Sequence, residues 1–296
     1  MILVRVFGGL GNQLFQYAAA KALALRNGVA LKLDINSVIN PDSHKRVYCL
    51  HNFNINTPIA GQEEIEKFLS PKKKYFKASR YILNKTGFGI HKSWWCQSYI
   101  YQGFYERYFY RPLKGDVYLD GYWQNEKLFI DYRDELLKEL SFKEKPDNKN
   151  QEVQNLILTV NAVSLHVRRG DALTEIARTI YKLPGEAYYK NAIEIIASRI
   201  SNPQFFVFSD DIEWCRNNIK TRYPMEFVAH NDDNKNYEDL RLMSSCNHHI
   251  TANSTFSWWG AWLNPSPDKI VVTPAEWFCT KKLNNNKIVP DSWIKV

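Results

Sequence analysis

An alternation of strand-like and helix-like runs in the second half of the chain constrains the fold more than any other feature. The strand-like runs are 162–167, 204–208, 226–228, 249–251 and 270–273. The helix-like runs between them are 187–200, 211–220, 237–245 and 256–263. Such alternation predicts a parallel, Rossmann-like sheet with right-handed crossovers. Because ligands of these sheets bind at the carboxyl ends of the strands, functional residues are expected just after strands.

The beginning of the chain predicts a strand–helix–strand unit. Residues 2–7 indicate a buried strand, and the turn Gly8-Gly9-Leu10-Gly11 follows it. From Asn12 to Arg26 apolar side chains recur on one helical face, and Asn27-Gly28 is typical of a helix end. Residues 29–33 then indicate a second strand.

The length of 296 residues suits two domains of ordinary size. The polar run 143–152, which contains a proline, is the candidate linker between them. We therefore expect an N-terminal domain of residues 1–148 and a C-terminal domain of residues 149–296. In an alternative arrangement, the last helix of the C-terminal domain packs back on the N-terminal domain.

The composition is that of a globular protein with a sizeable core. Apolar residues make up 45% and charged residues 24% of the chain, which excludes a disordered tail and a small disulfide scaffold. The mean hydropathy is −0.43, and neither a bilayer-spanning run nor a signal peptide is evident, so we expect a cytoplasmic protein. The five cysteines are widely spaced and form no zinc pattern, so reduced thiols are expected. The cysteine pattern does not exclude a metal site built from carboxylates alone.

The net charge of +8 comes from one stretch of the chain. Residues 67–105 contain eight basic residues and no Asp or Glu, and apolar doublets recur there at 68/69, 75/76 and 82/83, although Pro71 interrupts the first helical turn. The pattern fits a solvated helix packed on the core, or a surface that docks on anionic lipids. Nucleic acid is a weaker alternative and is not expected, because no binding motif accompanies the charge.

The hexapeptide 166–171 (HVRRGD) closes the strand-like run 162–167. Two adjacent arginines offer permanently charged, forked donors that suit phosphate oxygens. Neighbouring strand side chains point in opposite directions, so one arginine is expected to reach the ligand while the other braces an internal carboxylate. By alternation from His166 we assign the phosphate to Arg168, and a purely structural ion pair is the alternative.

Two further motifs follow strand-like runs. Ser209-Asp210-Asp211 places a carboxylate where it can accept hydrogen bonds from guanine or ribose, unless Asp211 only caps the next helix. The octapeptide 252–259 (ANSTFSWW) opens a helix whose hydroxyls and free N–H groups suit a diphosphate. Trp258 and Trp259 lie inside that helix and are expected in the core.

The segment 8–13 (GGLGNQ) lacks the spacing Gly-x-Gly-x-x-Gly of a dinucleotide loop. This disfavours an NAD-dependent oxidoreductase. The amides of Asn12 and Gln13 at the end of the segment can donate to an oxyanion or to a leaving phosphate.

Together these strings resemble the bacterial α-1,2-fucosyltransferases of glycosyltransferase family 11. The strings are GGLGNQLFQYA at 8–18, GYWQNEKLF at 121–129, HVRRGD at 166–171, FSDDIEWC at 208–215 and ANSTFSWWGAWL at 252–263. All five in this order are far more specific than any one of them. The resemblance implies an α/β, GT-B-type fold, in which two Rossmann-like domains with parallel sheets flanked by helices face a central cleft. It also implies GDP-β-L-fucose as donor, inversion at the fucose anomeric carbon, and no required metal or other cofactor.

The resemblance also assigns roles to particular residues. The implied donor-binding residues are Gly11, Asn12, His166, Arg168, Asp211, Ser254, Thr255 and Phe256. The implied catalytic candidates are Arg168, Asp171, Glu175 and Asn12, and the acceptor-side residues are Tyr122 and Gln124. Arg168 would hold the β-phosphate, His166 and Asp211 would lie near guanine, and Asp171 and Glu175 are the two candidates for the general base.

These roles imply an inverting galactoside α-1,2-fucosyltransferase that acts on the 2-hydroxyl of a terminal β-galactose. Its acceptor glycan, free or lipid-linked, would belong to O-antigen or another surface polysaccharide, and the stretch 67–105 would hold the enzyme at the inner face of the cytoplasmic membrane. The alternative is a carbohydrate-binding protein that needs no nucleotide, which the aromatic residues permit. That alternative leaves the arginine pair unexplained.

Overall fold

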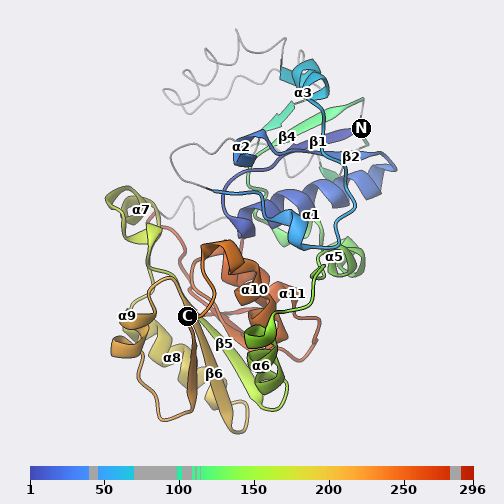
Figure 1. Cartoon of the computed structure of the whole chain (residues 1–296). Coiled ribbons are helices and arrows are strands. Elements are labelled where there is room, and N and C mark those ends of the chain that lie inside the picture. The colour runs from blue at the N-terminus through green and yellow to red at the C-terminus, as the bar shows by residue number, and fades with distance from the viewer. Residues whose placement is uncertain (40–45, 70–98, 102–108, 111, 114, 281–287) are drawn as a thin grey trace. The chain divides into compact units, whose positions relative to one another are not determined.

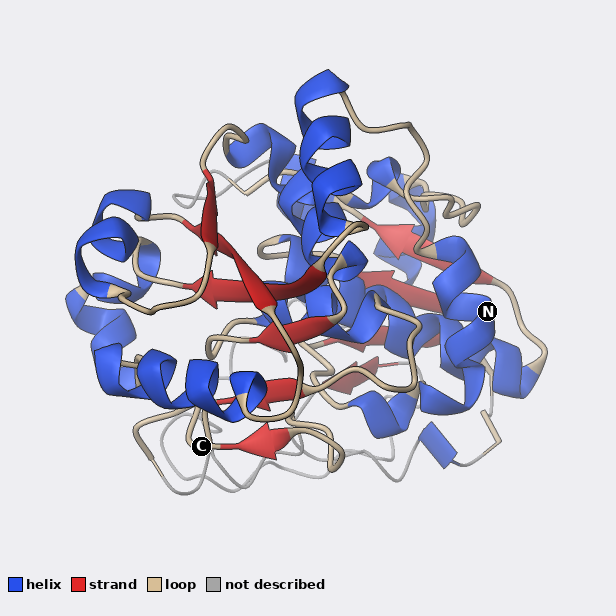
Figure 2. Cartoon of the chain, turned by 90° about the horizontal axis from the view of Figure 1, so that it is seen from below, coloured by secondary structure: helices blue, strands red, loops and turns tan. Residues whose placement is uncertain are grey.

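The computed structural model describes residues 1–39, 46–69, 99–101, 109–110, 112–113, 115–280 and 288–296. The chain divides into two compact units, each with its own parallel sheet and helices packed against it (Figures 1 and 2). Unit 1 comprises Met1–His51 and Ile55–Leu136, and unit 2 comprises Asn52–Asn54 and Leu137–Val296. The α/β class and the parallel sheets that the sequence predicts are confirmed.

Unit 1 begins with the predicted strand–helix–strand. β1 (Ile2–Arg5) leads into α1 (Leu10–Asn27), and β2 (Leu31–Asp34) returns parallel to β1. α1 ends where glycine is required, because Gly28 adopts the left-handed conformation (φ 61°) and donates its N–H to carbonyls of the last helical turn. The apolar face of α1 is fully buried at Leu14, Phe15, Ala18 and Ala22, which fixes the helix on the sheet, whereas Leu25 near its end is 39% exposed.

The rest of unit 1 completes a four-stranded sheet. Its helices and strands are α2 (Asn36–Ile39), α3 (Gln62–Leu69), β3 (Tyr99–Tyr101), β4 (Val117–Asp120) and α5 (Arg133–Glu139), with short 3₁₀ turns η1 (Leu50–Asn52), η4 (Glu126–Leu128) and η5 (Ile130–Tyr132). The strand order is β2-β1-β4-β3, all parallel. β1 and β4 are therefore neighbours although they are far apart in the sequence, and their carboxyl ends lie side by side.

Unit 2 contains every strand and helix that the alternation predicts. The strands are β5 (Asn161–Val167), β6 (Pro203–Ser209), β7 (Met225–Val228), β8 (His248–Ile250), β9 (Val271–Thr273) and β10 (Ile294–Lys295). The helices and 3₁₀ turns are α6 (Asn148–Ile157), η6 (Asp171–Leu173), α7 (Glu175–Ile180), α8 (Glu186–Ala197), α9 (Ile212–Asn218), η7 (Asp233–Lys235), α10 (Asn236–Ser245) and α11 (Thr255–Leu263). The order β10-β9-β8-β5-β6-β7 reverses direction between β5 and β8.

The core of unit 2 includes the tryptophans of α11. Trp258 and Trp259 are fully buried, with ring centroids 5.0 Å apart, so their predicted place in the core is confirmed. α11 packs closely on α10 at Gly260, where an added Cβ would lie 2.9 Å from the Cβ of Met243. Any side chain at Gly260 would therefore push the two helices apart.

Two expectations about the organisation of the chain differ from the structure. The division between the units falls at Leu136–Leu137, before the predicted boundary at residue 148. Within the polar run 143–152, Asp147 accepts a hydrogen bond from the Asn150 N–H (3.0 Å), so these polar residues begin a helix. The chain ends in β10, parallel to β9 in unit 2, and no terminal helix follows α11 in the described residues.

Most of the basic stretch 67–105 lies outside the described residues, so its docking to a membrane stays a prediction from the sequence. In the part of the chain that is described, no helix is long and apolar enough to cross a membrane. The cysteines in that part, at 49, 215, 246 and 279, are free thiols, as expected.

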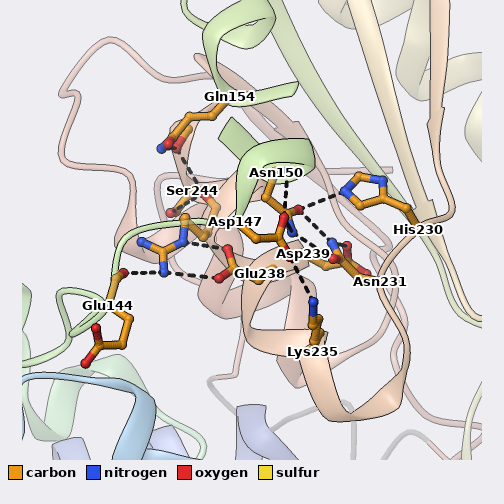
Figure 3. Close-up of polar contacts among 12 residues, drawn as sticks. Glu144, Asp147, Asn150, Gln154, His230, Asn231, Lys235, Glu238, Asp239 and Ser244 are labelled. Atoms are coloured by element: carbon orange, nitrogen blue, oxygen red, sulfur yellow. Dashed lines mark hydrogen bonds and ion pairs between the residues drawn. The ribbon is translucent and has the colours of Figure 1, made fainter. Parts of the chain in front are cut away.

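A polar cluster ties the start of α6 to the segment that follows β7 (Figure 3). The Asn150 side chain is fully buried. Its amide nitrogen donates to Asp147 (3.0 Å) and Asn231 (2.9 Å), and its oxygen lies 2.9 Å from His230 Nε2. Asn231 also donates to Asp239 on α10 (2.7 Å), which joins three segments through one chain of hydrogen bonds.

A buried ion pair holds the segment before α6 on α10. Arg241 Nε donates to Glu238 Oε2 (2.7 Å), and Arg241 Nη2 donates to the backbone carbonyl of Glu144 (2.8 Å). The guanidinium also lies 4.4 Å from the ring centroid of Phe142. Removing either charge would leave the other buried and unpaired, which is strongly destabilising.

Asp239 makes the stability of unit 2 depend on pH. Burial raises the pKa of its carboxyl from 3.8 to about 7, with neighbouring Glu238 adding to the effect and the Asn231 bond opposing it. Between these two values the folded state holds a proton that the unfolded chain releases. Stability is therefore lost as pH rises towards about 7, and the loss is complete above that value.

We expect Asp239→Asn to remove this loss, because asparagine keeps the acceptor for Asn231 and does not ionise. A pKa raised from 3.8 to about 7 corresponds to about 4 kcal/mol, so the variant should melt about 8–16 °C above the wild type near about pH 8 and no more than about 4 °C above it near about pH 4.5. Thermal melts of both proteins across pH test this. An equal difference at both ends of the range would contradict the raised pKa.

Candidate functional site

The carboxyl ends of β5 and β8 meet where the strand order of unit 2 reverses. Open parallel sheets bind ligands at this kind of position, because the connections leaving the two strands diverge to opposite sides. His166 lies near the end of β5, and Ser254 precedes α11 just after β8. The structure therefore brings together the two predicted motifs that carry them.

His166 is buried with one ring nitrogen unused. The residue is 7% exposed, and its Nδ1 has no hydrogen-bond partner among the described residues. Burial, with Arg168 adding, lowers the pKa of the imidazole to about 3. The ring is therefore neutral at physiological pH and offers one donor and one acceptor. A buried nitrogen without a partner is costly, and a ligand hydrogen bond would offset that cost.

Arg168 directly follows β5 and is half-buried. Its Nε and Nη2 donate to Asp171 Oδ1 at 3.2 and 3.0 Å. Its guanidinium lies 5.4 Å from the ring centroid of Tyr181. Asp171 is 47% exposed at its side chain, so this ion pair lies at the surface, where an anion can compete for the arginine.

Arg169 is the arginine that the protein itself holds. Its Nε donates to Asp211 Oδ2 (3.0 Å), and its guanidinium lies 4.2 Å from the ring centroid of Trp214. The prediction that one arginine braces an internal carboxylate agrees with this geometry. Asp211 Oδ1 accepts the Trp214 N–H (3.0 Å) and caps α9, which confirms the capping alternative. A contact of Asp211 with guanine stays a prediction.

The N-terminus of α11 lies beside His166. Ser254 Oγ accepts the N–H of Phe256 (3.3 Å), and the ring centroids of Phe256 and His166 are 5.7 Å apart. Ser254 is buried, whereas Thr255 and Phe256 are half-buried. The positive end of the helix dipole therefore faces the same place as His166, which favours an anion there.

Asp210 is a site residue that sequence reasoning missed. Its carboxylate accepts the backbone N–H of Arg169 (2.7 Å) and lies close to Gly170. The signal was present in Ser209-Asp210-Asp211, but the sequence does not reveal which aspartate faces the neighbouring strand. Burial raises the pKa of the Asp210 carboxyl, and the backbone amides of Arg169 and Gly170 oppose that rise.

Glu175, the second candidate for the general base, is the first residue of α7 and is exposed. Thr174 caps this helix by accepting the Ala177 N–H (3.3 Å). Among the described residues, no group of three or more His, Cys, Asp or Glu side chains could hold a metal ion.

In unit 1 the glycine-rich turn joins β1 to α1. Gly8 has φ 79°, and an added Cβ there would lie 2.9 Å from Asn12 Nδ2, so both backbone and space require glycine. Gly9 is the N-cap of α1, Gly11 is buried, and Asn12 is half-buried. The turn therefore presents Asn12 at the carboxyl end of β1.

Gln13 does not have the role that its sequence position suggested. Its Nε2 donates to the carbonyls of Gly8 (2.9 Å) and Val47 (2.7 Å), and its Oε1 accepts the Cys49 N–H (2.9 Å). The side chain is fully buried. Because both amide hydrogens are already used, Gln13 cannot donate to an oxyanion or a phosphate, and it clamps the turn to the segment near Cys49 instead.

Three side-chain pairs bridge the adjacent carboxyl ends of β1 and β4. The pairs are Arg5 Nη1 with Asp120 Oδ1 (3.4 Å), Phe7 with Tyr122 (ring centroids 4.9 Å apart), and Gln124 Nε2 donating to Asn12 Oδ1 (3.0 Å). Asn12, Tyr122 and Gln124, predicted from separate motifs, thus lie at one edge of the unit 1 sheet.

The loop that carries Tyr122 and Gln124 has an unusual backbone. Trp123, between them, has φ 54°, which is rare for a bulky residue. It is 3% exposed and packs on Phe109, with ring centroids 5.1 Å apart. Packing therefore holds a strained conformation, and such strain is typical of functional sites.

Comparison with known proteins adds a second line of information. The model of glycosyl transferase family 11 matches residues 1–296. The alpha-1,2-colitosyltransferase of Escherichia coli is 33% identical, with 100% of this chain and 99% of that protein covered. The O-antigen biosynthesis glycosyltransferase WbnK of Escherichia coli is 32% identical, with 98% of each chain covered. Galactoside alpha-(1,2)-fucosyltransferase 2 of Rattus norvegicus is 28% identical, with 89% of this chain and 67% of that protein covered.

Solved structures share the fold at low identity. The α-1,6-fucosyltransferase NodZ, co-crystallised with GDP, has a TM-score of 0.52 at 12% identity, with 89% of this chain and 92% of that chain covered. A variant of Arabidopsis thaliana FUT1 in complex with GDP has a TM-score of 0.50 at 13% identity, with 91% and 69% covered. The predicted GT-B-type fold is confirmed by these likenesses.

We expect Gln13→Ala to destabilise unit 1 by about 3 kcal/mol, because three buried backbone groups lose their partner. Urea unfolding measures the loss. The matched control is Gln62→Ala, an exposed glutamine of the same unit, which should change stability by less than about 0.5 kcal/mol. A Gln13→Ala protein of normal stability would contradict the clamp.

Proposed function

Because the chain belongs to glycosyl transferase family 11, we propose that it is an inverting galactoside α-1,2-fucosyltransferase. It takes L-fucose from GDP-β-L-fucose and transfers it to the 2-hydroxyl of a terminal β-galactose. The observation that carries the proposal is the meeting of His166, Arg168 and the N-terminus of α11 at the carboxyl ends of β5 and β8. The name of the relative from Rattus norvegicus supports fucose as the sugar, and both this name and that of the colitosyltransferase support an α-1,2 linkage.

The groups at this edge of the unit 2 sheet suit a nucleoside diphosphate. Arg168 supplies a forked cation at the surface, and the start of α11 supplies a positive dipole end. His166 adds a neutral ring nitrogen that has no hydrogen-bond partner in the part of the chain that the structure describes. NodZ, which shares the fold, was crystallised with GDP, and this supports GDP as the nucleotide here.

The proposed roles of these residues follow from where charge develops during the reaction. As the bond from the fucose C1 to the phosphate oxygen lengthens, positive charge grows on the sugar and negative charge on the departing GDP. Arg168 and the N-terminus of α11 stabilise that negative charge without a divalent ion. The galactose 2-hydroxyl attacks from the opposite face of C1, and a carboxylate, Glu175 or Asp171, accepts its proton. Glu175 is exposed at the start of α7, and Asp171 would be released from its pair with Arg168 when the diphosphate binds that arginine.

The edge of the unit 1 sheet suits the acceptor sugar. Tyr122 is 42% exposed and packs against Phe7, so it offers an aromatic surface to the apolar face of a pyranose. The amides of Gln124 and Asn12 lie at the same edge and can bond to sugar hydroxyls. We propose that this edge binds the β-galactoside.

The similarity to a colitosyltransferase makes GDP-colitose a second candidate for the donor substrate. Colitose is fucose without its 3-hydroxyl, and the relative that carries this name is 33% identical over the whole chain. Turnover with GDP-fucose and with GDP-colitose, each at several concentrations, decides between the donors through the ratio of their kcat/KM values.

A carbohydrate-binding protein that needs no nucleotide is the competing function. A calorimetric titration with GDP separates the two, because such a protein would give no heat. Turnover with GDP-fucose and a panel of β-galactosides, followed by NMR of the product, identifies the linkage. Absence of GDP binding and of transfer to every β-galactoside would overturn the proposal.

We expect Arg168→Ala to lower kcat by about 10²–10³, as the loss of one preorganised charged donor does. The matched control is Arg199→Ala, an exposed arginine at the end of α8, which should stay within about twofold of the wild type. Steady-state kinetics at saturating donor is the measurement, and chelation by EDTA should leave wild-type kcat unchanged. Activity that vanishes with chelator and returns only with Mg²⁺ or Mn²⁺ would contradict a metal-independent reaction.

We expect Tyr122→Ala to raise the acceptor KM about tenfold, which corresponds to about 1.4 kcal/mol of lost binding. The KM for GDP-fucose should change by less than about twofold, because the donor contacts are elsewhere. Tyr110→Ala, which removes another exposed tyrosine of unit 1, is the control. Equal effects on both KM values would argue against an acceptor contact at Tyr122.

A further inference from the structure

The short turn after β5 is held from the neighbouring strand. Asp210, which directly follows β6, accepts the N–H of Arg169 with its Oδ1 (2.7 Å), and its Oδ2 lies against Gly170. One carboxylate thus touches two successive residues of the turn that begins at Arg168, and it accepts the amide hydrogen of the first.

Gly170 makes this approach of the carboxylate feasible. A Cβ added at Gly170 would lie 2.6 Å from Asp210 Oδ2 and 3.1 Å from its Cγ. Real Cβ atoms do not come so close to other heavy atoms, so any side chain at this position would displace the Asp210 carboxylate. The close contact between this turn and Asp210 therefore requires both the aspartate and a glycine at position 170.

The same turn is also fixed through its side chain. The Arg169 guanidinium is bound by Asp211 Oδ2 (3.0 Å) and packs over the Trp214 ring. Consecutive aspartates after β6 therefore hold the backbone and the side chain of Arg169. Arg168 lies between the last residue of β5 and this doubly held neighbour, so its backbone has little freedom to turn.

We infer that Asp210 is a positioning residue, which clamps the Arg169–Gly170 turn and thereby directs Arg168 at the donor diphosphate. The inference rests on the proposed function of Arg168. It assigns Asp210 no contact with the substrate and no proton transfer. Its effect on the reaction passes entirely through the geometry of Arg168, because a charged donor stabilises a phosphate only when it is already in place.

The test measures the donor side separately from the acceptor side. In the full chain, Asp210→Ala should raise the Kd of GDP and the KM of GDP-fucose about tenfold and leave the acceptor KM within about twofold. Asp210→Asn should raise the Kd of GDP only about threefold, because its oxygen still accepts one amide. The control is Asn161→Ala, which removes a side-chain bond to the Ser201 carbonyl at the opposite end of β5 and should leave GDP binding unchanged.

A double variant tests whether Gly170 acts through Asp210. Gly170→Ala alone should weaken GDP binding about tenfold, because the new Cβ displaces the carboxylate. Gly170→Ala combined with Asp210→Ala should bind GDP no more weakly than Asp210→Ala alone, since the clash and the clamp are then both absent. Effects that multiply to about a hundredfold would overturn the inference.

The outcomes separate this inference from the proposed function. A wild-type protein that does not bind GDP contradicts the proposed function. A wild-type protein that binds GDP, together with a folded Asp210→Ala protein that binds it equally tightly, overturns the clamp alone. If Asp210→Ala fails to fold, Gly170→Ala decides, and a GDP Kd within about twofold of wild type then overturns the inference.

Discussion

The contrast between the two arginines after β5 underlies the candidate donor site. Arg169 is held at its backbone by Asp210 and at its side chain by Asp211 and Trp214. Among the described residues, Arg168 pairs with Asp171, whose side chain is 47% exposed, and lies over the ring of Tyr181. The two guanidinium groups therefore have different carboxylate partners, although the residues are neighbours in the chain. One arginine can therefore fix the turn while the other stays available to an anion.

In both units, candidate functional groups meet at the carboxyl ends of two adjacent parallel strands, but the chemical nature of these groups differs. In unit 2 the adjacent ends of β5 and β8 bring together charged and dipolar groups, at His166, Arg168 and the start of α11. In unit 1 the adjacent ends of β1 and β4 bring together aromatic rings and amides. Phosphates are recognised by charge, whereas sugars are recognised by an apolar surface edged with hydrogen-bonding groups. A transferase needs both kinds of site, and under the proposed function the edge of each sheet would supply one of them.

The sequence predicted the elements well where burial is periodic and local signals end a helix. α1 with Gly28, and the strands and helices from β5 to β9, follow from such patterns. The residue roles that the sequence predicted wrongly or missed depend on residues that become neighbours only in the folded chain. From the sequence, the Gln13 amide could donate to a ligand, but in the structure it donates to the carbonyl of Val47. The sequence also does not distinguish the roles of Asp210 and Asp211, because the bond from the Arg169 N–H to Asp210 forms only when β5 pairs with β6. β3 and β4 escaped notice because a short strand among aromatic residues has no period of its own.

The choice between fucose and colitose depends on groups other than those that hold the nucleotide. The contacts of Arg168 and α11 would act on phosphate, which two GDP-linked donors share, so these residues cannot distinguish the sugars. Discrimination must come from a residue at the 3-position. A protein group that hydrogen-bonds the 3-hydroxyl would reject the deoxy sugar by about 10⁴-fold, because that group would be left buried and unpaired. An apolar surface there would reject fucose only weakly. A single side chain near C3 can therefore change the donor while the diphosphate site stays the same, which explains how relatives at 28–33% identity carry the names of different sugars.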